Sequence, residues 1–343
     1  GFTGTPIQDE NQKKSNTTTD VFGDELHRYS IADGIRDRNV LAFDPYMVCT
    51  YKDRDVRQQV ALEQAKAHSV AEALADPAKK KAYLRFMNPA DLPMAGFRHP
   101  DGKYVRGIED YIPESQYAGV DGAGNPEHFR MVFDDILDGW QALSQGGKFH
   151  AIFATRSIPE AITYYRMFRD NAPQLKVTAL FDPNIGNSNP DNPEGTLFKE
   201  DGLVDILDGY ARLYPGKEYT ISTHAQFKRD VAARLGHKKP YVGIEKTSER
   251  KLDLLIVVNQ MLTGFDSKWV NTLYLDKVME YEALIQAFSR TNRLFGPDKP
   301  FGVTRYYRRP HTMKRNVEDA VKLYSGDRPF GLFVEKLEDN LRH

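Results

Sequence analysis

The chain has 343 residues, of which 40% are hydrophobic and 28% charged, and its 47 Lys and Arg residues nearly balance 48 Asp and Glu residues. This composition excludes wholesale disorder, and the net charge of −1 means that any contact with phosphates must come from local basic clusters. The single cysteine, Cys49, excludes an intramolecular disulfide, and we expect it to be a small buried residue in a reducing, cytoplasmic setting. The longest strongly apolar run, residues 254–258, is far too short to span a membrane.

Residues 1–45 are predicted to end one domain and to cross into the next. Within them, Ser30 and Asp33 have the spacing of a capping box that opens a short helix. Residues 40–43 then predict a short strand that ends before Pro45. The chain opens without an initiator methionine, so we expect it to be part of a longer protein.

Residues 46–147 are predicted to be a connector that is partly helical and partly irregular. Pro, Gly and Tyr are frequent over residues 88–125, which indicates a long irregular excursion. Asp134 and Asp135 lie in the middle of a predicted helix and are expected to face solvent. Helical patterning covers residues 57–74, 79–87 and 129–143.

From residue 148 the pattern alternates between strands and helices. Strands are predicted over residues 149–154, 177–181, 253–258, 272–275 and 302–307. Helices are predicted from Ser157 to about Arg169, over 223–235, where Thr223 and Gln226 form a capping box, and over 281–290. Such alternation predicts an α/β domain over 148–310, with a parallel sheet and helices on both faces. Residues 311–343 are predicted to begin a further, helical C-terminal region.

Three segments are predicted to lie at carboxyl ends of strands, where parallel sheets bind ligands: Thr3-Gly4-Thr5-Pro6, residues 259–266 and residues 286–293. In the third segment Arg290 and Arg293 are three residues apart on a predicted helix and therefore share one face, with Gln286 one turn before them. A guanidinium pair supplies the fixed positive charge that phosphoryl transfer needs at a γ-phosphate. Each segment also has an ordinary interpretation: a turn, a helix N-terminus and a solvated helical face.

In this order, the three segments resemble motifs III, V and VI of superfamily 2 helicases, with Ser289 where motif VI usually has glycine. Three longer strings resemble the R subunit of type I restriction enzymes: Gly-Phe-Thr-Gly-Thr-Pro-Ile, Val-Asn-Gln-Met-Leu-Thr-Gly-Phe-Asp-Ser and Leu-Ile-Gln-Ala-Phe-Ser-Arg-Thr-Asn-Arg. Phe22-Gly23 and the following Tyr-Ser-Ile-Ala-Asp-Gly-Ile are similar to the same family. The resemblance covers most of residues 1–310.

The resemblance implies the second RecA-like lobe of an ATP-dependent DNA translocase. Arg290 and Arg293 would reach the γ-phosphate of ATP bound on a neighbouring lobe, and Gln286 would support them. Gly264 and Asp266 would help to close the nucleotide cleft. Coupling of hydrolysis to movement is implied for Thr3, Gly4 and Thr5, and DNA binding for Thr155, Arg156, Ser157 and Thr263. The implied cofactors are ATP and Mg²⁺, and the implied partners are double-stranded DNA and the methyltransferase and specificity subunits.

Several sequence signals of a complete motor or nuclease do not occur in this chain. It contains neither a Gly-x-x-x-x-Gly-Lys-Ser/Thr phosphate loop nor an Asp-Glu-x-His magnesium box, and no convincing nuclease carboxylate–lysine cluster. We therefore expect the isolated chain to bind ATP poorly and not to hydrolyse it, whereas the full R subunit would be active. The histidines lack a metal-ligand spacing, so the sequence assigns no metal site.

Residues 305–315 interleave basic and aromatic side chains, a pattern that suits contact with the DNA backbone and stacking on bases. An edge strand that runs into a solvated loop would give the same pattern, and the sequence does not separate the two. Two other functions also remain open for the whole chain. One is a lobe of another superfamily 2 helicase, such as a repair helicase, and the other is a non-catalytic module that binds DNA or protein.

Overall fold

Six parallel strands form one sheet in the order β1-β8-β7-β4-β6-β5. The computed structural model describes residues 6–7, 17–24, 27, 29–117, 127–182 and 193–325, without the side chains of 193–197. The strands are β1 (Phe43–Met47), β4 (His150–Thr155), β5 (Val177–Leu180), β6 (Leu254–Val257), β7 (Val270–Asp276) and β8 (Gly302–Tyr306). Strands β4, β5, β6 and β7 are buried along their whole length, as expected for a parallel sheet covered on both faces. The predicted α/β architecture is confirmed.

The position of strand β1 differs from two predictions about the start of the sheet. The predicted strand before Pro45 is wrong, because β1 runs through this proline, which pairs with Thr304 of β8. An edge strand tolerates a proline because one side of its backbone needs no ladder hydrogen bond. The boundary predicted after residue 45 therefore falls inside a strand of the sheet. Cys49, two residues beyond β1, is exposed rather than buried.

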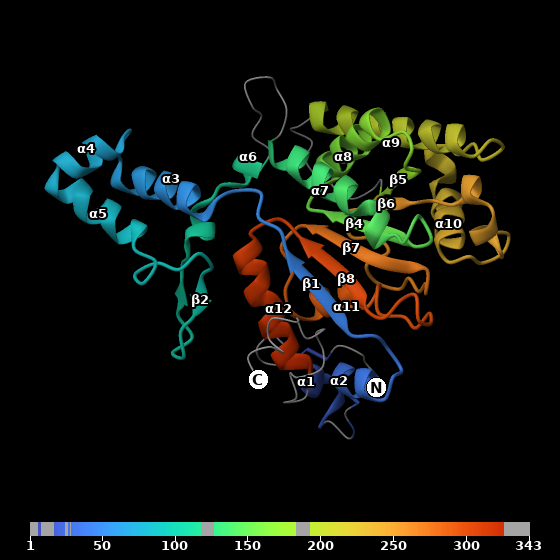
Figure 1. Ribbon diagram of the computed structural model, residues 1–343, viewed down its shortest axis with the longest axis horizontal. Helices are drawn as coiled ribbons and strands as arrows, with labels where there is room; N and C mark the ends of the chain where they lie inside the picture. The colour runs from blue at the N-terminus through green and yellow to red at the C-terminus, as the bar shows by residue number, and fades with distance from the viewer. Residues whose placement is uncertain are drawn as a thin grey trace.

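Helices cover both faces of the sheet (Figure 1). One face carries α7 (Glu127–Leu143), α8 (Ile158–Asn171) and α9 (Pro193–Leu213), and α10 (His224–Leu235) packs beside α9. On this face, Phe129 of α7 stacks on Tyr164 of α8 with ring centroids 4.4 Å apart. The other face carries α11 (Tyr281–Phe288) and α12 (Pro310–Tyr324). Because α7 and α12 contribute to the same hydrophobic core as the strands, we treat the sheet and its helices as one lobe.

Short elements complete the lobe. They are α1 (Thr18–Phe22), α2 (Ile31–Arg36) and the 3-10 helices η3 (Ile221–Thr223), η4 (Ile244–Lys246) and η5 (Ser248–Arg250). The predicted capping box of α2 is confirmed, since the Ser30 side chain accepts from Asp33 N at 3.1 Å and Ser30 N donates to Asp33 Oδ2 at 2.9 Å. The predicted box of α10 is wrong, because the Thr223 side chain makes no capping hydrogen bond to that helix. Thr223 Oγ1 instead accepts from Thr220 N, at 2.8 Å.

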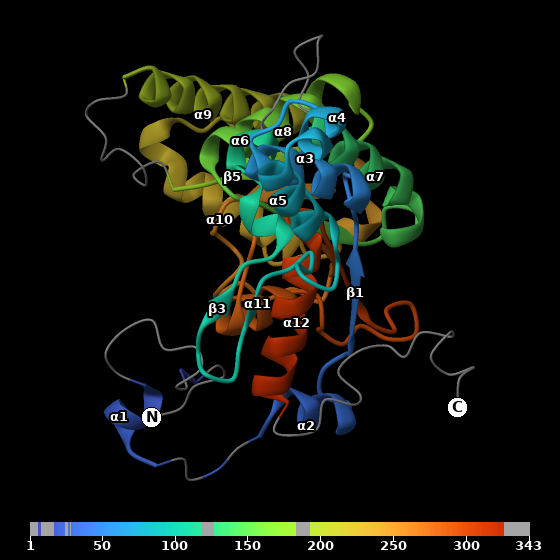
Figure 2. The ribbon, with the colours of Figure 1, turned by 90° about the vertical axis from the view of Figure 1, so that its left-hand side faces the viewer.

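Residues 51–117 form a second unit with its own hydrophobic core, which we call the helical module. It contains α3 (Asp53–Ala65), α4 (Val70–Ala75), α5 (Pro77–Met87), a hairpin of β2 (Phe97–Arg98) and β3 (Tyr104–Val105), the 3-10 helix η2 (Ile108–Tyr111) and α6 (Glu114–Tyr117). The predicted helix over 57–74 is interrupted after Ala65, where Lys66 adopts a left-handed φ of 54°. Figures 1 and 2 show α3, α4 and α5 projecting from one side of the lobe.

Some predictions fall outside the described residues. The coupling residues Thr3, Gly4 and Thr5 lie there. Of the predicted C-terminal region, only the part up to Ser325 is described, and α12 within it packs on the lobe. Among the helices that the structure does describe, none is both long enough and apolar enough to cross a membrane.

Candidate functional site at the two ends of the sheet

The arginine pair follows helix α11 instead of lying on it. Helix α11 ends at Phe288, so the prediction that Arg290 and Arg293 share one helical face is wrong. Tight turns end the helix, with Arg290 N bonded to Ala287 O at 3.0 Å and Thr291 N bonded to Phe288 O at 3.0 Å. Thr291 is fully buried, and it packs against Gly302, the first residue of β8.

Local contacts hold both guanidinium groups. Arg290 donates from Nη1 to Phe265 O and from Nε to Gln286 O, the latter at 3.0 Å. Arg293 Nε forms an ion pair with Asp266 Oδ1 at 2.5 Å. Burial lowers the pKa of Arg290, and the positive charge of Arg293 lowers it further. The structure therefore joins the two segments that the sequence singled out separately, 259–266 and 286–293.

These contacts lie at the amino end of the sheet. Asp266 precedes the first residue of β7 by four positions, and Thr291 packs against the first residue of β8. The prediction that all three segments lie at carboxyl ends of strands is therefore wrong for Asp266, Arg290 and Arg293. The physical reason is that the connection from β6 to β7 contains no helix, so residues 259–266 themselves run from the carboxyl end to the amino end.

A cavity of about 600 Å³ adjoins Arg293. Its lining includes Arg293 and Asp266 together with Lys238, Lys268 and Trp269. Trp269 stacks on His237 with ring centroids 3.9 Å apart and an interplanar angle of 11°. Thr263 and Gly264 are exposed on the same connection, and Gly264 has a φ of +69° that favours glycine. The cavity lining thus combines three cationic side chains with two carboxylates, Asp266 and Glu245.

Lys299 is a buried cation at this end that the sequence analysis missed. Its Nζ donates to Val270 O at 2.7 Å and to Lys268 O at 3.2 Å. Burial lowers the pKa of Lys299 to about 7, with a further contribution from the positive charge of Arg293. Lys299 thus ties the first residue of β7 to the loop before β8. From the sequence alone, a buried lysine in a loop cannot be distinguished from an exposed one.

The predicted DNA-binding residues after β4 lie at the opposite, carboxyl end. Thr155 is fully buried, and its hydroxyl donates to Ser157 O at 3.2 Å and to Val257 O at 3.3 Å. Ser157 caps α8 by accepting from Glu160 N at 3.4 Å. Arg156 is the exposed member, with 48% of its side chain accessible and ion pairs to Glu114 at 3.5 Å and Glu160 at 3.9 Å. Of the three residues, Arg156 is therefore the one whose charge can reach a ligand.

Lys277 is a second cation at the carboxyl end, and the sequence analysis missed it as well. It follows β7 directly and donates to Val258 O at 2.8 Å and to Asn259 Oδ1 at 2.7 Å. Burial lowers the pKa of Lys277 to about 8. The rule that parallel sheets bind ligands at carboxyl ends could have indicated this residue from its position alone.

For the basic and aromatic stretch over 305–315, the alternative of an edge strand that runs into a solvated loop is wrong. The stretch is neither an edge strand nor a solvated loop, since β8 lies inside the sheet and Arg308 is 1% exposed. Its side chains pair with the protein's own carboxylates. Arg305 binds Asp135 at 2.6 and 3.0 Å, and Arg308 contacts Glu114 at 2.8 Å. Asp135, expected to face solvent, is thus largely covered by this pairing.

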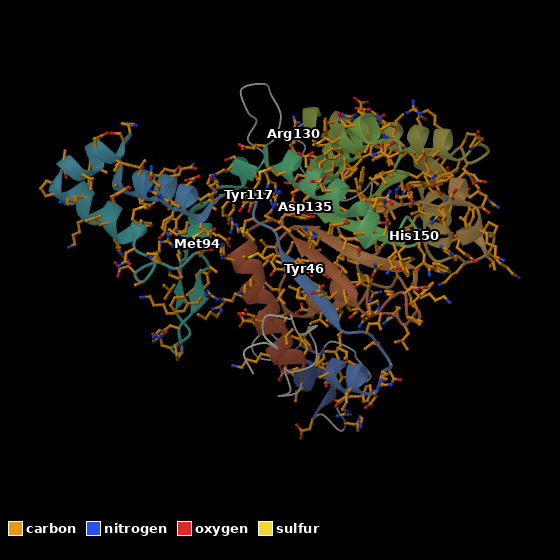
Figure 3. All side chains as sticks on the ribbon, in the orientation of Figure 1. Tyr46, Met94, Tyr117, Arg130, Asp135 and His150 are labelled. Atoms are coloured by element: carbon orange, nitrogen blue, oxygen red, sulfur yellow. The ribbon has the colours of Figure 1, made fainter. Side chains whose placement is uncertain are left out.

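Asp276, the last residue of β7, is the centre of a buried polar network at the carboxyl end. Its carboxylate accepts from Tyr164 Oη at 2.8 Å, lies 2.8 Å from His128 Nε2 and pairs with Arg308 Nε at 3.2 Å. Burial would raise the pKa of Asp276, but His128 and Arg308 outweigh burial and hold it well below its usual range. This network fixes the strand end beside Arg156 and Lys277. Figure 3 shows Tyr117, near this end, and His150, at the amino end of β4, on opposite sides of the lobe.

Comparisons with known proteins match most of the chain. Residues 147–309 match a model of type I restriction enzyme subunit R domain 3, and residues 1–82 match a model of the SWI2/SNF2 ATPase. The type I restriction enzyme SsaAORF53P endonuclease subunit of Staphylococcus saprophyticus is 29% identical over 331 residues, which is 95% of this chain and 29% of that protein. The SauMRSORF196P endonuclease subunit of Staphylococcus aureus strain MRSA252 is 29% identical over 332 residues, again 95% of this chain and 29% of that protein.

The chain thus spans only 29% of the length of these curated relatives. Among solved structures, the ATP-dependent Type ISP restriction-modification enzyme LlaBIII bound to DNA aligns with 88% of this chain and 15% of that chain. Its sequence identity is 12% and its TM-score is 0.34, a likeness too low for a comparison of individual sites.

Proposed function

Because the chain belongs to the R subunits of type I restriction enzymes, we propose that it supplies the second lobe of an ATP-dependent DNA translocase. In this proposal the amino end of the sheet faces nucleotide, and the carboxyl end faces double-stranded DNA. The observation that carries the proposal is the joining of residues 259–266 to residues 286–293 through Arg293–Asp266 and Arg290–Phe265 O, beside an open cavity. The methyltransferase and specificity subunits would complete the complex.

At the nucleotide end, Arg290 and Arg293 differ in the contacts that they make before nucleotide binds. Arg290 donates to carbonyl oxygens, and within the described ranges it is in no ion pair, so its positive charge is not neutralised. Arg293 is neutralised by Asp266, whose side chain is 68% exposed. A γ-phosphate carries more negative charge than a carboxylate, so it would compete with Asp266 for Arg293. Arg290 would then act as a fixed cation, and Arg293 as one that exchanges its partner.

ATP and Mg²⁺ would be held mainly by a neighbouring lobe. The residues of this chain fit the phosphate end of ATP, because the amino end offers two guanidinium groups close to each other. They do not form an obvious magnesium site, since Asp266 is already paired with Arg293. When bound, Mg²⁺ would supply charge neutralisation at the phosphates, and this chain would supply the arginines that complete it.

At the DNA end, Arg156 and Lys277 are the cations that we propose contact phosphates. Arg156 follows β4, which lies in the sheet between β7, followed by Lys277, and β6, which leads into the connection to β7. Strand β4 has 6 residues, so at about 3.3 Å per residue its first and last residues are about 17 Å apart. One connection, 259–266, thus has Asn259 bonded to Lys277 at the DNA end and Asp266 bonded to Arg293 at the nucleotide end. This arrangement supports a mechanical link between nucleotide and DNA.

DNA-stimulated ATP hydrolysis by the full R subunit tests the nucleotide end. Arg290→Ala and Arg293→Ala should each lower the rate at least about tenfold, since arginine fingers contribute about 10³–10⁵. Arg130→Ala is a matched control, because Arg130 is 67% exposed on α7 and its pairing with Asp134 is long, at 3.8 Å. This control should hydrolyse ATP at the parent rate.

A non-catalytic DNA or protein interaction module is the alternative, and the ion pair between Arg293 and Asp266 favours it. A lobe without a nucleotide role does not need an unpaired arginine, and Arg293 is already paired with Asp266. If both arginine variants hydrolyse ATP at the parent rate, the interaction module becomes the better description.

A further inference from the structure

Three side chains of metal-binding type meet where the helical module joins the lobe. Cys49 follows β1, Asp53 is the first residue of α3, and His311 is the second residue of α12. One ligand atom from each residue lies within 4.8 Å of the other two. His311 Nε2 is 2.9 Å from Asp53 Oδ1. We propose that Cys49, Asp53 and His311 bind a divalent transition metal of the zinc type.

The donor set suits this chemistry. Thiolate, imidazole and carboxylate are the three protein ligands of zinc, and three of them leave a fourth tetrahedral position for water. Metal–ligand distances of about 2.0–2.3 Å place neighbouring donors about 3.5 Å apart, so the cluster must contract by roughly an ångström. The side chains can make this movement, because Cys49 is exposed and 48% of the Asp53 side chain is accessible.

The electrostatic surroundings favour a cation. Glu109 is fully buried, and it accepts from His311 N at 2.9 Å and Thr312 N at 2.7 Å. This carboxylate neutralises the positive N-terminal end of α12, which would otherwise repel a metal ion. Burial raises the pKa of the Cys49 thiol, and the negative charges of Asp53 and Glu109 raise it further. A bound cation would offset that negative charge and favour the thiolate.

The location gives the metal a structural role. Asp53 opens the helical module, whereas His311 belongs to a helix whose core residues pack in the lobe. The other polar contacts between the two units include Arg309 with Glu114 at 3.1 Å and Arg315 with Ala95 O at 3.0 Å. A metal would add a coordinate cross-link to these hydrogen bonds. It would therefore fix the angle at which the module projects from the lobe.

Spectroscopic titration of the reduced chain with Co²⁺ tests the proposal directly. A cysteine thiolate bound to Co²⁺ gives a near-ultraviolet charge-transfer absorption, and Cys49 is the chain's single cysteine. We expect this band to appear with one Co²⁺ per chain and to disappear when Zn²⁺ is added. Cys49→Ser should abolish the band, and His311→Gln should weaken Co²⁺ binding at least about tenfold.

His99→Gln is the matched control, because His99 also pairs with an aspartate, Asp101, at 3.2 Å but has no cysteine in its cluster. This variant should titrate like the parent. Zn²⁺ should also raise the melting temperature of the parent chain and leave that of Cys49→Ser unchanged. Absence of the band at excess Co²⁺, or a band that is unaffected in His311→Gln, would overturn the proposed site.

Discussion

Replacing Asp276 with alanine should remove the centre of the polar network at the carboxyl end of the sheet. Asp276 is fully buried and serves three partners, Tyr164, His128 and Arg308. An alanine leaves the Tyr164 hydroxyl and the His128 ring nitrogen without a partner in a buried space. Each such group costs about 1–3 kcal/mol.

The ion pair between Asp276 and Arg308 also bears on the free energy of unfolding. Arg308 is 1% exposed, but it keeps Glu114 at 2.8 Å and Glu160 at 3.2 Å after Asp276 is lost. The buried charge therefore remains partly compensated, and the full penalty of an unpaired arginine does not arise. We expect Asp276→Ala to lower the free energy of unfolding by about 2–6 kcal/mol, the cost of leaving two buried polar groups without a partner.

Urea denaturation followed by tryptophan fluorescence measures this change. Asp134→Ala is the control, because Asp134 is 56% exposed and its pair with Arg130 is 3.8 Å long, so a change within about 0.5 kcal/mol is expected. An Asp276→Ala variant whose free energy of unfolding stays within about 1 kcal/mol of the parent would refute the reasoning, since it would mean that the network contributes little.

The acid dependence gives an independent check on the same carboxylate. The pKa of Asp276 is lower in the folded protein than in the unfolded chain, because His128 and Arg308 outweigh the effect of burial. Its contribution to stability is therefore present above the ordinary aspartate pKa of about 4 and is lost as the pH falls further. Asp276→Asn should flatten this part of the pH profile. An unchanged acid profile in the variant would show that Asp276 is not the titrating group.

Two further predictions concern the ends of the sheet. Lys277→Met should lower the magnitude of the salt dependence of duplex-DNA binding by about one unit of slope, measured by fluorescence anisotropy with the R subunit. Because the pKa of Lys277 is lowered to about 8, parent affinity should fall from pH 7 to pH 9, and a parent-like fall in the variant would contradict this role. Gly302→Ala should lower the free energy of unfolding by about 1–3 kcal/mol, since its Cβ would lie 2.3 Å from Thr291 Oγ1 and 2.8 Å from Thr291 O. Gly139→Ala, whose Cβ would meet only the flexible end of Leu143, is the control in the same denaturation assay, and equal losses for both variants would contradict the steric argument.

Much of the lobe could be predicted from its local patterns. The unbroken apolar run at 254–258 predicts a buried strand, and β6 covers Leu254–Val257. The capping pattern at Ser30 depends on residues three apart and is present as predicted. Helix α9 shows that a clear signal can be overlooked. Its buried residues Leu203, Ile206, Leu207 and Tyr210 recur at helical spacing, yet the sequence analysis assigned no helix there.

The ends of the sheet could not be predicted in the same way. Whether Asp266 lies at the carboxyl or the amino end depends on whether a helix separates β6 from β7, and the residues of that connection show no period that decides it. Ion pairs such as Arg305 with Asp135 join positions 170 residues apart, which spacing along the chain cannot reveal. The same limit applies to the cluster of Cys49, Asp53 and His311, whose members come from three segments.

The absence of a helix between β6 and β7 has a consequence for how the lobe would transmit movement. In a strand–helix–strand unit, the connection packs along its whole length, so a change at one end is absorbed by many contacts. Here Thr263 and Gly264 are exposed, whereas Met261, Leu262 and Phe265 are buried in the core of the lobe. Polar contacts hold the connection at Asn259, Phe265 and Asp266. A phosphate that draws Arg293 away from Asp266 would therefore release one of these contacts, whereas Arg290 would still hold Phe265 O beside it.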